Sequence, residues 1–236
     1  MLDQQYQTQL SNNYWYAQLS PEHQQYIATH SQLLEFNKDQ NIFLSGDAFN
    51  GMYAVLNGAI RLGYIDIQGK EAIAAIAEPI MWFGEISLVD QLPRSHDAIA
   101  LQKTTVLHWP SRSIQHLLNE QPQFWFHIAQ LTSQKLRFAF LELISIQTQN
   151  IRQRLAQRLL FILNGYGNHI TIEQRSIHLS QEQLAQLLIC SRQTINQALQ
   201  ELEKLGVLKV AFRKIEILDL ALLHRIAHTL TIHEPE

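Results

Sequence analysis

The clearest alternation of apolar and polar positions lies at residues 180–199, where two short stretches of helical period are separated by a break. Ser180 can cap the first stretch, and Gln183, three residues later, completes a capping box. Ser191 can cap the second stretch. Leucine or isoleucine occupies the inward-facing positions Leu184, Leu187, Leu188, Ile195, Leu199 and Leu202. The pattern therefore predicts two amphipathic helices joined by a tight turn.

The outward face of the second predicted helix is polar near its N-terminus. Its exposed residues are Arg192, Gln193, Thr194, Asn196 and Gln197. Arginine and glutamine have the length and the donors to read base edges in a DNA major groove. A helical hairpin in an ordinary protein core would show the same apolar spacing, so the hairpin alone leaves both interpretations open.

The residues that follow this hairpin favour DNA reading. Gly206 can end the second helix, and residues 207–210 and 215–218 predict two strands around a short turn. Helix, helix and hairpin form a winged arrangement. Arg213 and Lys214 then lie at the tip of the wing, where a DNA phosphate would pass.

Short β-rich runs separated by turn signals fill residues 33–110. Strands are expected at residues 41–44, 52–56, 59–65 and 72–77. Asn57-Gly58 is a strong signal for a two-residue hairpin, and Gly69 marks another turn. Such spacing predicts a sandwich or a barrel. Upstream, residues 1–19 predict a loose arm or a short helix, and Ser20 and Pro21 begin a further helix.

A long helix is predicted over residues 123–149, after a short helix over residues 111–120. One apolar stripe comprises Phe124, Ile128, Leu131, Leu136, Phe140, Leu143 and Ile146, and another comprises Phe138, Leu141 and Ile144. Two stripes need two partners. The β-rich region can cover one of them, and a second copy of the chain is the natural cover for the other. The alternative is that the same chain covers both. A further helix is expected from residue 151 to about residue 164.

Composition adds constraints on partners and location. The chain has 236 residues, 46% of them apolar, which suffices for two domains with cores. Residues 1–150 hold 8 Lys/Arg against 13 Asp/Glu, whereas residues 151–236 hold 10 against 8. The mildly basic C-terminal part predicts a few placed DNA contacts, doubled by dimerisation. No membrane span or signal peptide is recognisable, so we expect a cytoplasmic protein that does not bind a membrane.

Residue chemistry argues against catalysis and against most cofactors. No nucleophile–base motif, P-loop or metal-ligand spacing rises above background, so we expect no enzyme activity. Cys190 is the single cysteine, which excludes an internal disulfide and an iron–sulfur cluster. Haem would need an axial ligand, and none of the 11 histidines has an identifying context. His224 and His228 are spaced for a metal, although such pairs usually lie on a solvated face.

From about Leu19 onward the chain resembles the CRP/FNR family of bacterial transcription regulators. The resemblance rests on Phe83-Gly-Glu-Ile-Ser-Leu-Val-Asp-Gln-Leu-Pro-Arg-Ser95, the long helix, Cys190-Ser-Arg-Gln-Thr194 and Ile215-Glu-Ile-Leu-Asp219, in that order. It implies an α+β fold with a double-stranded, jelly-roll-like β-roll, a dimerisation helix and a C-terminal winged helix-turn-helix. The expected domains are an arm at 1–19, a cyclic-nucleotide-binding-like β-roll at 20–122, the dimerisation helix at 123–150 and a DNA-binding domain at 151–236.

The resemblance also implies an allosteric effector in the β-roll, with cyclic AMP as one possibility. Gly84, Glu85, Arg94 and Ser95 match the positions that hold a cyclic nucleotide in relatives. The chemistry agrees, because Gly84 permits a close backbone approach, Arg94 and Ser95 can hold a phosphate, and Glu85 can accept from a sugar hydroxyl. The alternative is that Glu85 and Arg94 pair with each other and pin the roll. Another small molecule, or none, would then control the protein.

Departures from the family pattern favour that alternative. His96 and Asp97 stand where cyclic-nucleotide binders have small or hydroxyl residues, and Asp97 adds negative charge. An ungapped match also places Ala139 and Phe140 where binders of cyclic AMP offer hydroxyls to the adenine.

At the DNA end, the resemblance assigns guanine reading to Arg192, within a palindromic double-stranded operator. Gln193 and Gln197 differ from much of the family, so we expect a half-site of different sequence. Ile189 stands where the turn usually has glycine. A β-branched residue at positive φ would be strained, so either the turn differs or neighbouring packing compensates. RNA polymerase is an expected partner. A nucleotide-binding regulatory module without DNA reading is the remaining alternative.

Overall fold

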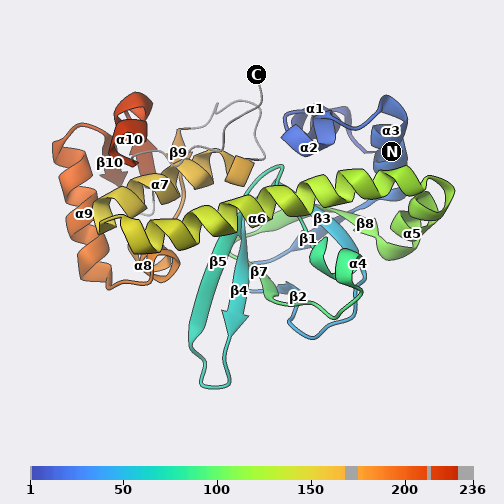
Figure 1. Ribbon diagram of the computed structural model, residues 1–236, viewed down its shortest axis with the longest axis horizontal. Helices are drawn as coiled ribbons and strands as arrows, with labels where there is room; N and C mark the ends of the chain where they lie inside the picture. Colours follow the sequence, from blue (N-terminus) through green and yellow to red (C-terminus); the bar gives the residue numbers. More distant parts are fainter. Residues whose placement is uncertain (1, 168–174, 212–213, 228–236) are drawn as a thin grey trace. The chain divides into compact units, whose positions relative to one another are not determined.

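The computed structural model describes residues 2–167, 175–211 and 214–227, which fold into two compact units. Among them, unit 1 holds residues 2–134 and Gly167, and unit 2 holds residues 135–166, 175–211 and 214–227. The boundary falls inside helix α6 (Trp125–Thr148). Figure 1 shows β-sheets in one unit and mainly helices in the other, which confirms the predicted α+β fold class. In the described part of the chain, no helix is long and apolar enough to cross a membrane.

Unit 1 is built on two four-stranded antiparallel sheets, with strand orders β1-β8-β3-β6 and β2-β7-β4-β5. The strands are β1 (Gln32–Phe36), β2 (Asn41–Phe43), β3 (Gly51–Asn57), β4 (Ile60–Ile65), β5 (Glu71–Ala77), β6 (Trp82–Phe83), β7 (Asp97–Ala100) and β8 (Thr104–Pro110). β4 and β5 form a long hairpin (Figure 1), and its Gly69 turn was predicted correctly. Two packed sheets of this order confirm the predicted β-roll.

The predicted hairpin at Asn57-Gly58 is wrong. β3 pairs with β6 and β8, whereas β4 pairs with β5 and β7, so Asn57 and Gly58 carry the chain from one sheet to the other. Gly58 has φ +92°, and a Cβ atom there would lie 2.4 Å from Thr104 Oγ1 and 2.7 Å from the carbonyl of Lys103. The turn residues thus reflect a crowded corner as well as a positive φ.

Three N-terminal helices, α1 (Gln4–Leu10), α2 (Tyr14–Ala17) and α3 (Pro21–His30), pack on this roll. Leu10 and Trp15 are buried in the same core as Trp82 and Trp109. The indole nitrogen of Trp15 donates to the carbonyl of His127 at 2.6 Å. Residues 1–19 therefore contribute apolar surface to the core. The helix start at Ser20 is confirmed by its cap on the amide of His23.

The segment after the sheets was predicted closely. α5 (Ser111–Glu120) matches the expected short helix, and a 3₁₀ turn (Pro122–Phe124) leads into α6. The covering of α6 differs from the expectation. Phe124, Ile128 and Leu131 of the first stripe are buried in unit 1, whereas its later members Leu136, Phe140, Leu143 and Ile146 are exposed. The first part of the stripe is therefore covered by unit 1, and its later part is left exposed.

In unit 2, Phe138 of α6 is buried against Phe161 and Tyr166. The elements are α7 (Ile151–Leu163), the 3₁₀ turn Gly165–Gly167, β9 (Ser176–Ile177), α8 (Gln181–Leu188), α9 (Arg192–Lys204), β10 (Leu208–Ala211), β11 (Lys214–Ile217) and α10 (Leu220–Ala227). Their sheet has the order β10-β11-β9. Helices α8 and α9 followed by the β10–β11 hairpin confirm the predicted winged helix-turn-helix. Residues 170–172, whose Ile-Thr-Ile sequence also predicts a short strand, lie outside the described residues.

Candidate functional sites

The two helices of the reading element begin at the predicted caps. Ser180 Oγ accepts from the amide of Gln183 at 3.1 Å, and Gln183 Oε1 accepts from the amide of Ser180 at 2.8 Å. This reciprocal pair is the capping box expected from the sequence. Ser191 Oγ accepts from the amide of Thr194 at 3.1 Å and lies 2.8 Å from Thr194 Oγ1. Capping therefore fixes where the exposed face of α9 starts.

The side chains predicted to read DNA lie on the outward face of α9. Arg192, Gln193 and Gln197 are exposed, whereas Thr194 and Asn196 are partly buried. Ile195, Ala198, Leu199 and Leu202 hold the opposite face in the core. The side-chain nitrogen Nε2 of Gln181 donates to Asn196 Oδ1 at 3.4 Å, which links the starts of the two helices. The exposed donors are the ones a major groove could meet.

The turn between these helices is strained at Ile189. This residue has φ +53° and ψ +53° and is 77% exposed. Its amide donates to the carbonyl of Gln186, and the amide of Cys190 donates to the carbonyl of Ala185. The left-handed backbone costs an L-residue about 1–2 kcal/mol, and a β-branched side chain adds crowding. Burial raises the pKa of the Cys190 thiol, which does not favour a reactive thiolate.

Of the two wing residues predicted to contact DNA phosphate, one lies in the described part of the chain. Lys214 is the first residue of β11, pairs with Ala211 of β10 and is partly exposed. Arg213 lies outside the described residues. Lys214 thus stands at the turn end of the hairpin, as the sequence predicted, and its contact with DNA stays a prediction.

In the β-roll, Gly84 and Arg94 come together, although ten residues separate them. Arg94 Nη1 donates to the carbonyl of Gly84 at 2.8 Å. Gly84 has φ +96°, and a Cβ atom there would lie 2.9 Å from that nitrogen. Glycine is therefore required both by the backbone conformation and by the guanidinium packed against it.

Arg94 is held in a cradle that the sequence did not reveal. Its Nη2 donates to Asn50 Oδ1 at 2.7 Å and to the carbonyl of Gly51 at 2.6 Å. The guanidinium carbon lies 4.2 Å from the ring centre of Phe43 and 5.0 Å from that of Phe49. Arg94 is only 3% exposed, and burial lowers its pKa. The residues of the cradle lie more than forty positions upstream in ordinary β-strand and loop patterns, so no local signal marks them.

One of the three guanidinium nitrogens takes no part in these bonds. Within the described residues, Arg94 Nε is buried and has no hydrogen-bond partner. A buried unpaired N–H costs free energy that a ligand oxyanion could recover. At the same time, the three bonds to Asn50, Gly51 and Gly84 pin three segments of the roll. Arg94 therefore pins the roll mainly through carbonyl and amide oxygens.

The other predicted pocket residues differ in accessibility. Glu85 is 1% exposed and precedes α4 (Ile86–Asp90), whereas Ser95 is exposed and its Oγ lies 3.0 Å from His96 Nδ1. Asp97 is buried and accepts from the amides of Ser45 and Ile65 at 2.8 and 3.1 Å. Its carboxylate ties the chain after β2 to the end of β4, the two strands that flank β7, which gives it a structural role.

A metal site receives no support from the described residues, none of which form a group of three or more His, Cys, Asp or Glu suited to an ion. His224 lies on α10, and its predicted companion His228 lies outside the described residues.

Comparisons with known proteins match both units of the chain. A model of the cyclic nucleotide-binding domain matches residues 33–121, and a model of the Crp-like helix-turn-helix domain matches residues 153–226. The cyclic AMP receptor protein of Thermus thermophilus is 30% identical over 210 residues, which cover 89% of this chain and 94% of that protein.

Two further matches extend the comparison. A CRP-like cAMP-activated global transcriptional regulator of Mycobacterium tuberculosis is 24% identical over 189 residues, covering 80% of this chain and 84% of the relative. The solved structure of FixK2 from Bradyrhizobium japonicum gives a TM-score of 0.73 at 20% identity and covers 85% of this chain and 99% of that one. This last likeness shows the fold alone.

Proposed function

The chain belongs to the CRP/FNR family of transcription regulators, and from this premise we propose that it works as a homodimer that reads a palindromic DNA operator. The observation that carries the proposal is the outward face of α9, where Arg192, Gln193 and Gln197 are exposed beside a capped helix start. Such a face can enter a major groove. The cytoplasm is the proposed location, and RNA polymerase is the proposed partner once DNA is bound.

Operator selection followed by binding measurements tests this reading role. The parent protein would be used to select duplexes from a random-sequence library, and affinity for the selected duplex would be measured by fluorescence anisotropy. Arg192→Ala should weaken binding by about 1–3 kcal/mol per half-site and relax the base preference at one position. If Arg192→Ala keeps the parent's affinity and base preference, Arg192 does not read a base. Failure of the parent protein to select any sequence would instead favour a nucleotide-binding module that does not read DNA.

The proposed dimer rests on α6. Leu136, Phe140 and Leu143 lie one turn apart on the face of α6 opposite to the buried Phe138 and Ser145. Leucine and phenylalanine side chains in such a row gain free energy when a second copy of the same helix covers them. Two paired α9 helices would then match the two halves of a palindromic operator.

For the β-roll, we propose a small anionic effector that binds at Gly84, Glu85, Arg94 and Ser95. The buried, unpaired Nε of Arg94 and the exposed hydroxyl of Ser95 support an oxyanion there. The relatives named as cAMP-responsive make cyclic AMP the first compound to test. The second candidate is an effector-independent regulator, which the three internal bonds of Arg94 favour.

Calorimetry separates these two candidates. Titration of the full chain with cyclic AMP and cyclic GMP at up to about millimolar concentration should give heat if the nucleotide binds. Ser95→Ala should weaken this binding and leave folding intact, because Ser95 is exposed. An absence of heat with both nucleotides excludes them as effectors, and a panel of other anionic metabolites then decides between another effector and none.

A further inference from the structure

The C-terminus of α8 is closed in an unusual way. The last four carbonyls of a helix have no partner within it. In α8, the carbonyls of Ala185 and Gln186 accept from the amides of Cys190 and Ile189, as expected for a left-handed cap. The remaining two carbonyls, of Leu187 and Leu188, accept from arginine side chains of another helix. Every one of the four groups is thereby satisfied.

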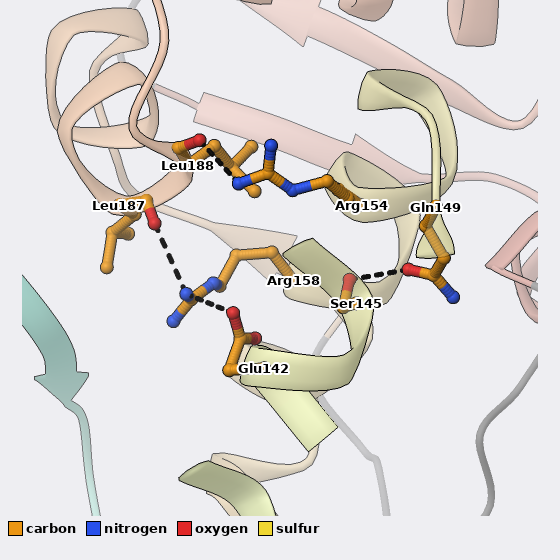
Figure 2. A network of polar contacts seen from close by, with 7 residues as sticks. All are labelled: Glu142, Ser145, Gln149, Arg154, Arg158, Leu187 and Leu188. Carbon is orange, nitrogen blue, oxygen red and sulfur yellow. Dashed lines mark hydrogen bonds and ion pairs between the residues drawn. The ribbon is translucent and has the colours of Figure 1, made fainter. Parts of the chain in front are cut away.

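These arginines are Arg154 and Arg158, one turn apart on α7. Arg154 Nη2 donates to the carbonyl of Leu188 at 2.7 Å, and Arg158 Nη2 donates to the carbonyl of Leu187 at 3.2 Å. Figure 2 shows both side chains reaching the end of α8. A positive charge at a helix C-terminus interacts favourably with the helix dipole as well as with its free carbonyls. Since Leu188 directly precedes the turn at Ile189, the two arginines fix the backbone just before the turn that leads into α9.

One of the two arginines is also tied to α6. Arg158 Nη2 lies 2.5 Å from Glu142 Oε2, and the two side chains are 6% and 20% exposed. Burial raises the pKa of Glu142, and the charges of Arg158 and Arg154 act in the opposite direction. A charge pair this far from water is strong only while both partners stay in place, because loss of one leaves the other desolvated.

The end of α6 has a second polar attachment in the same unit. Ser145 is buried, and its Oγ donates to Gln149 Oε1 at 2.6 Å. The side-chain nitrogen Nε2 of Gln149 in turn donates to the carbonyl of Ala227 at the end of α10. Glu142 and Ser145 therefore lie on the inward side of α6, opposite to the exposed Leu143. Glu142 joins this helix to α7, and through Arg158 to α8 (Figure 2), whereas Ser145 joins it through Gln149 to α10.

We propose that Arg158 is a positioning residue for DNA reading, and that Glu142 sets it, so that the last turns of α6 fix the geometry of the turn before α9. The proposal rests on the DNA-reading role proposed above. The Glu142 carboxylate directs the guanidinium of Arg158 to the carbonyl of Leu187, while Arg154 fixes Leu188 alongside. Any displacement of α6 against α7 must either carry the end of α8 with it or break the buried pair.

The test uses the full-length protein with Glu142→Gln, Arg158→Met and both changes together. Affinity would be measured for the duplex selected by the parent protein and for an unrelated duplex of equal length. Each single change should weaken binding to the selected duplex by about tenfold or more, and the double variant should be little worse than either, because both changes break the same link. Binding to the unrelated duplex should change by less than about twofold, since it depends on charge rather than on α9 geometry. Arg158→Lys, which keeps the charge next to Glu142, should recover part of the specific affinity.

A second readout keeps the proposal testable without an operator. Amide hydrogen exchange at Ile189 and Cys190 should speed up in Glu142→Gln, which is also the milder variant if Arg158→Met does not fold. The matched control is Glu201→Gln, which breaks the exposed pair between Arg152 of α7 and Glu201 of α9 and should alter neither quantity. Unchanged specific affinity in Glu142→Gln, an equal loss for both duplexes, or additive effects in the double variant would overturn the proposal. A parent protein that selects no duplex, with exchange still accelerated in Glu142→Gln, would refute only the reading function.

Discussion

Ile189 carries a backbone conformation that suits glycine, and its side chain contributes little in return. It has φ +53° and is 77% exposed, so replacing it removes scarcely any buried apolar surface. Ile189→Gly should raise the free energy of unfolding by about 1 kcal/mol, because the relief of left-handed strain exceeds the extra freedom that glycine gives the unfolded chain. Denaturant unfolding followed by circular dichroism measures this change.

The control for this prediction is Ile189→Val, which keeps a β-branched side chain and should gain nothing. A glycine variant no more stable than the valine variant would show that the strain is compensated elsewhere. The sequence raised the possibility of strain at Ile189 and left open a different turn, and the short-range hydrogen bonds, whose partners lie within five residues, now define the turn. The setting of Arg94 could not be predicted in the same way. Its acceptors on Asn50 and Gly51 become neighbours only when the sheets pack.

Helix α6 shows the same limit at the scale of an element. Its extent followed from apolar periodicity, and its two stripes were identified from spacing alone. Which neighbour covers each part did not follow, because Ile128 is buried in unit 1 whereas Phe140, on the same predicted stripe, is exposed. Spacing defines a face, but packing decides what meets it. The prediction of a hairpin at Asn57-Gly58 was wrong for a related reason, because a turn signal does not specify which sheet the next strand joins.

The exposed part of α6 leads to a prediction about assembly. Leu143→Glu places a charge in the row that we propose as the dimer interface, and it should weaken dimerisation by about 100-fold or more, because a buried unpaired carboxylate is costly. Size-exclusion chromatography with light scattering would show a monomer at concentrations where the parent protein is a dimer. Leu92→Glu is the control, since Leu92 of unit 1 is 60% exposed and Leu143 is 55% exposed. Equal masses for the Leu143 variant and the parent would remove α6 from the interface.

At the scale of the whole molecule, acidic and basic residues are divided unevenly between the two parts of the chain. The net charge of −3 combines an acidic excess in residues 1–150 with a small basic excess in residues 151–236. Because the acidic part repels DNA, we expect binding to come from the C-terminal part, strengthened by the dimerisation proposed above. We also expect the stability of unit 1 to depend on pH, through a carboxyl group whose pKa is raised by burial.

Glu78 is the group in unit 1 for which this sensitivity has a definite sign. Burial raises its pKa from 4.5 to about 7, so between these values the unfolded chain loses the proton while the folded unit keeps it. Stability conferred by the protonated form is present in full below pH 4.5 and falls as pH rises to about 7. Glu78→Gln should therefore leave stability unchanged near pH 4 and raise it by about 2 kcal/mol at pH 8. This figure is smaller than the full pKa shift would give, because the side chain is partly exposed.

All four tryptophans lie in unit 1, so tryptophan fluorescence during urea unfolding follows this unit alone. The control is Glu120→Gln, at an exposed position, which should change the stability of unit 1 neither at pH 4 nor at pH 8. An equal stability change at pH 4 and pH 8 in the Glu78 variant would mean that the carboxyl group does not titrate between folded and unfolded states as described.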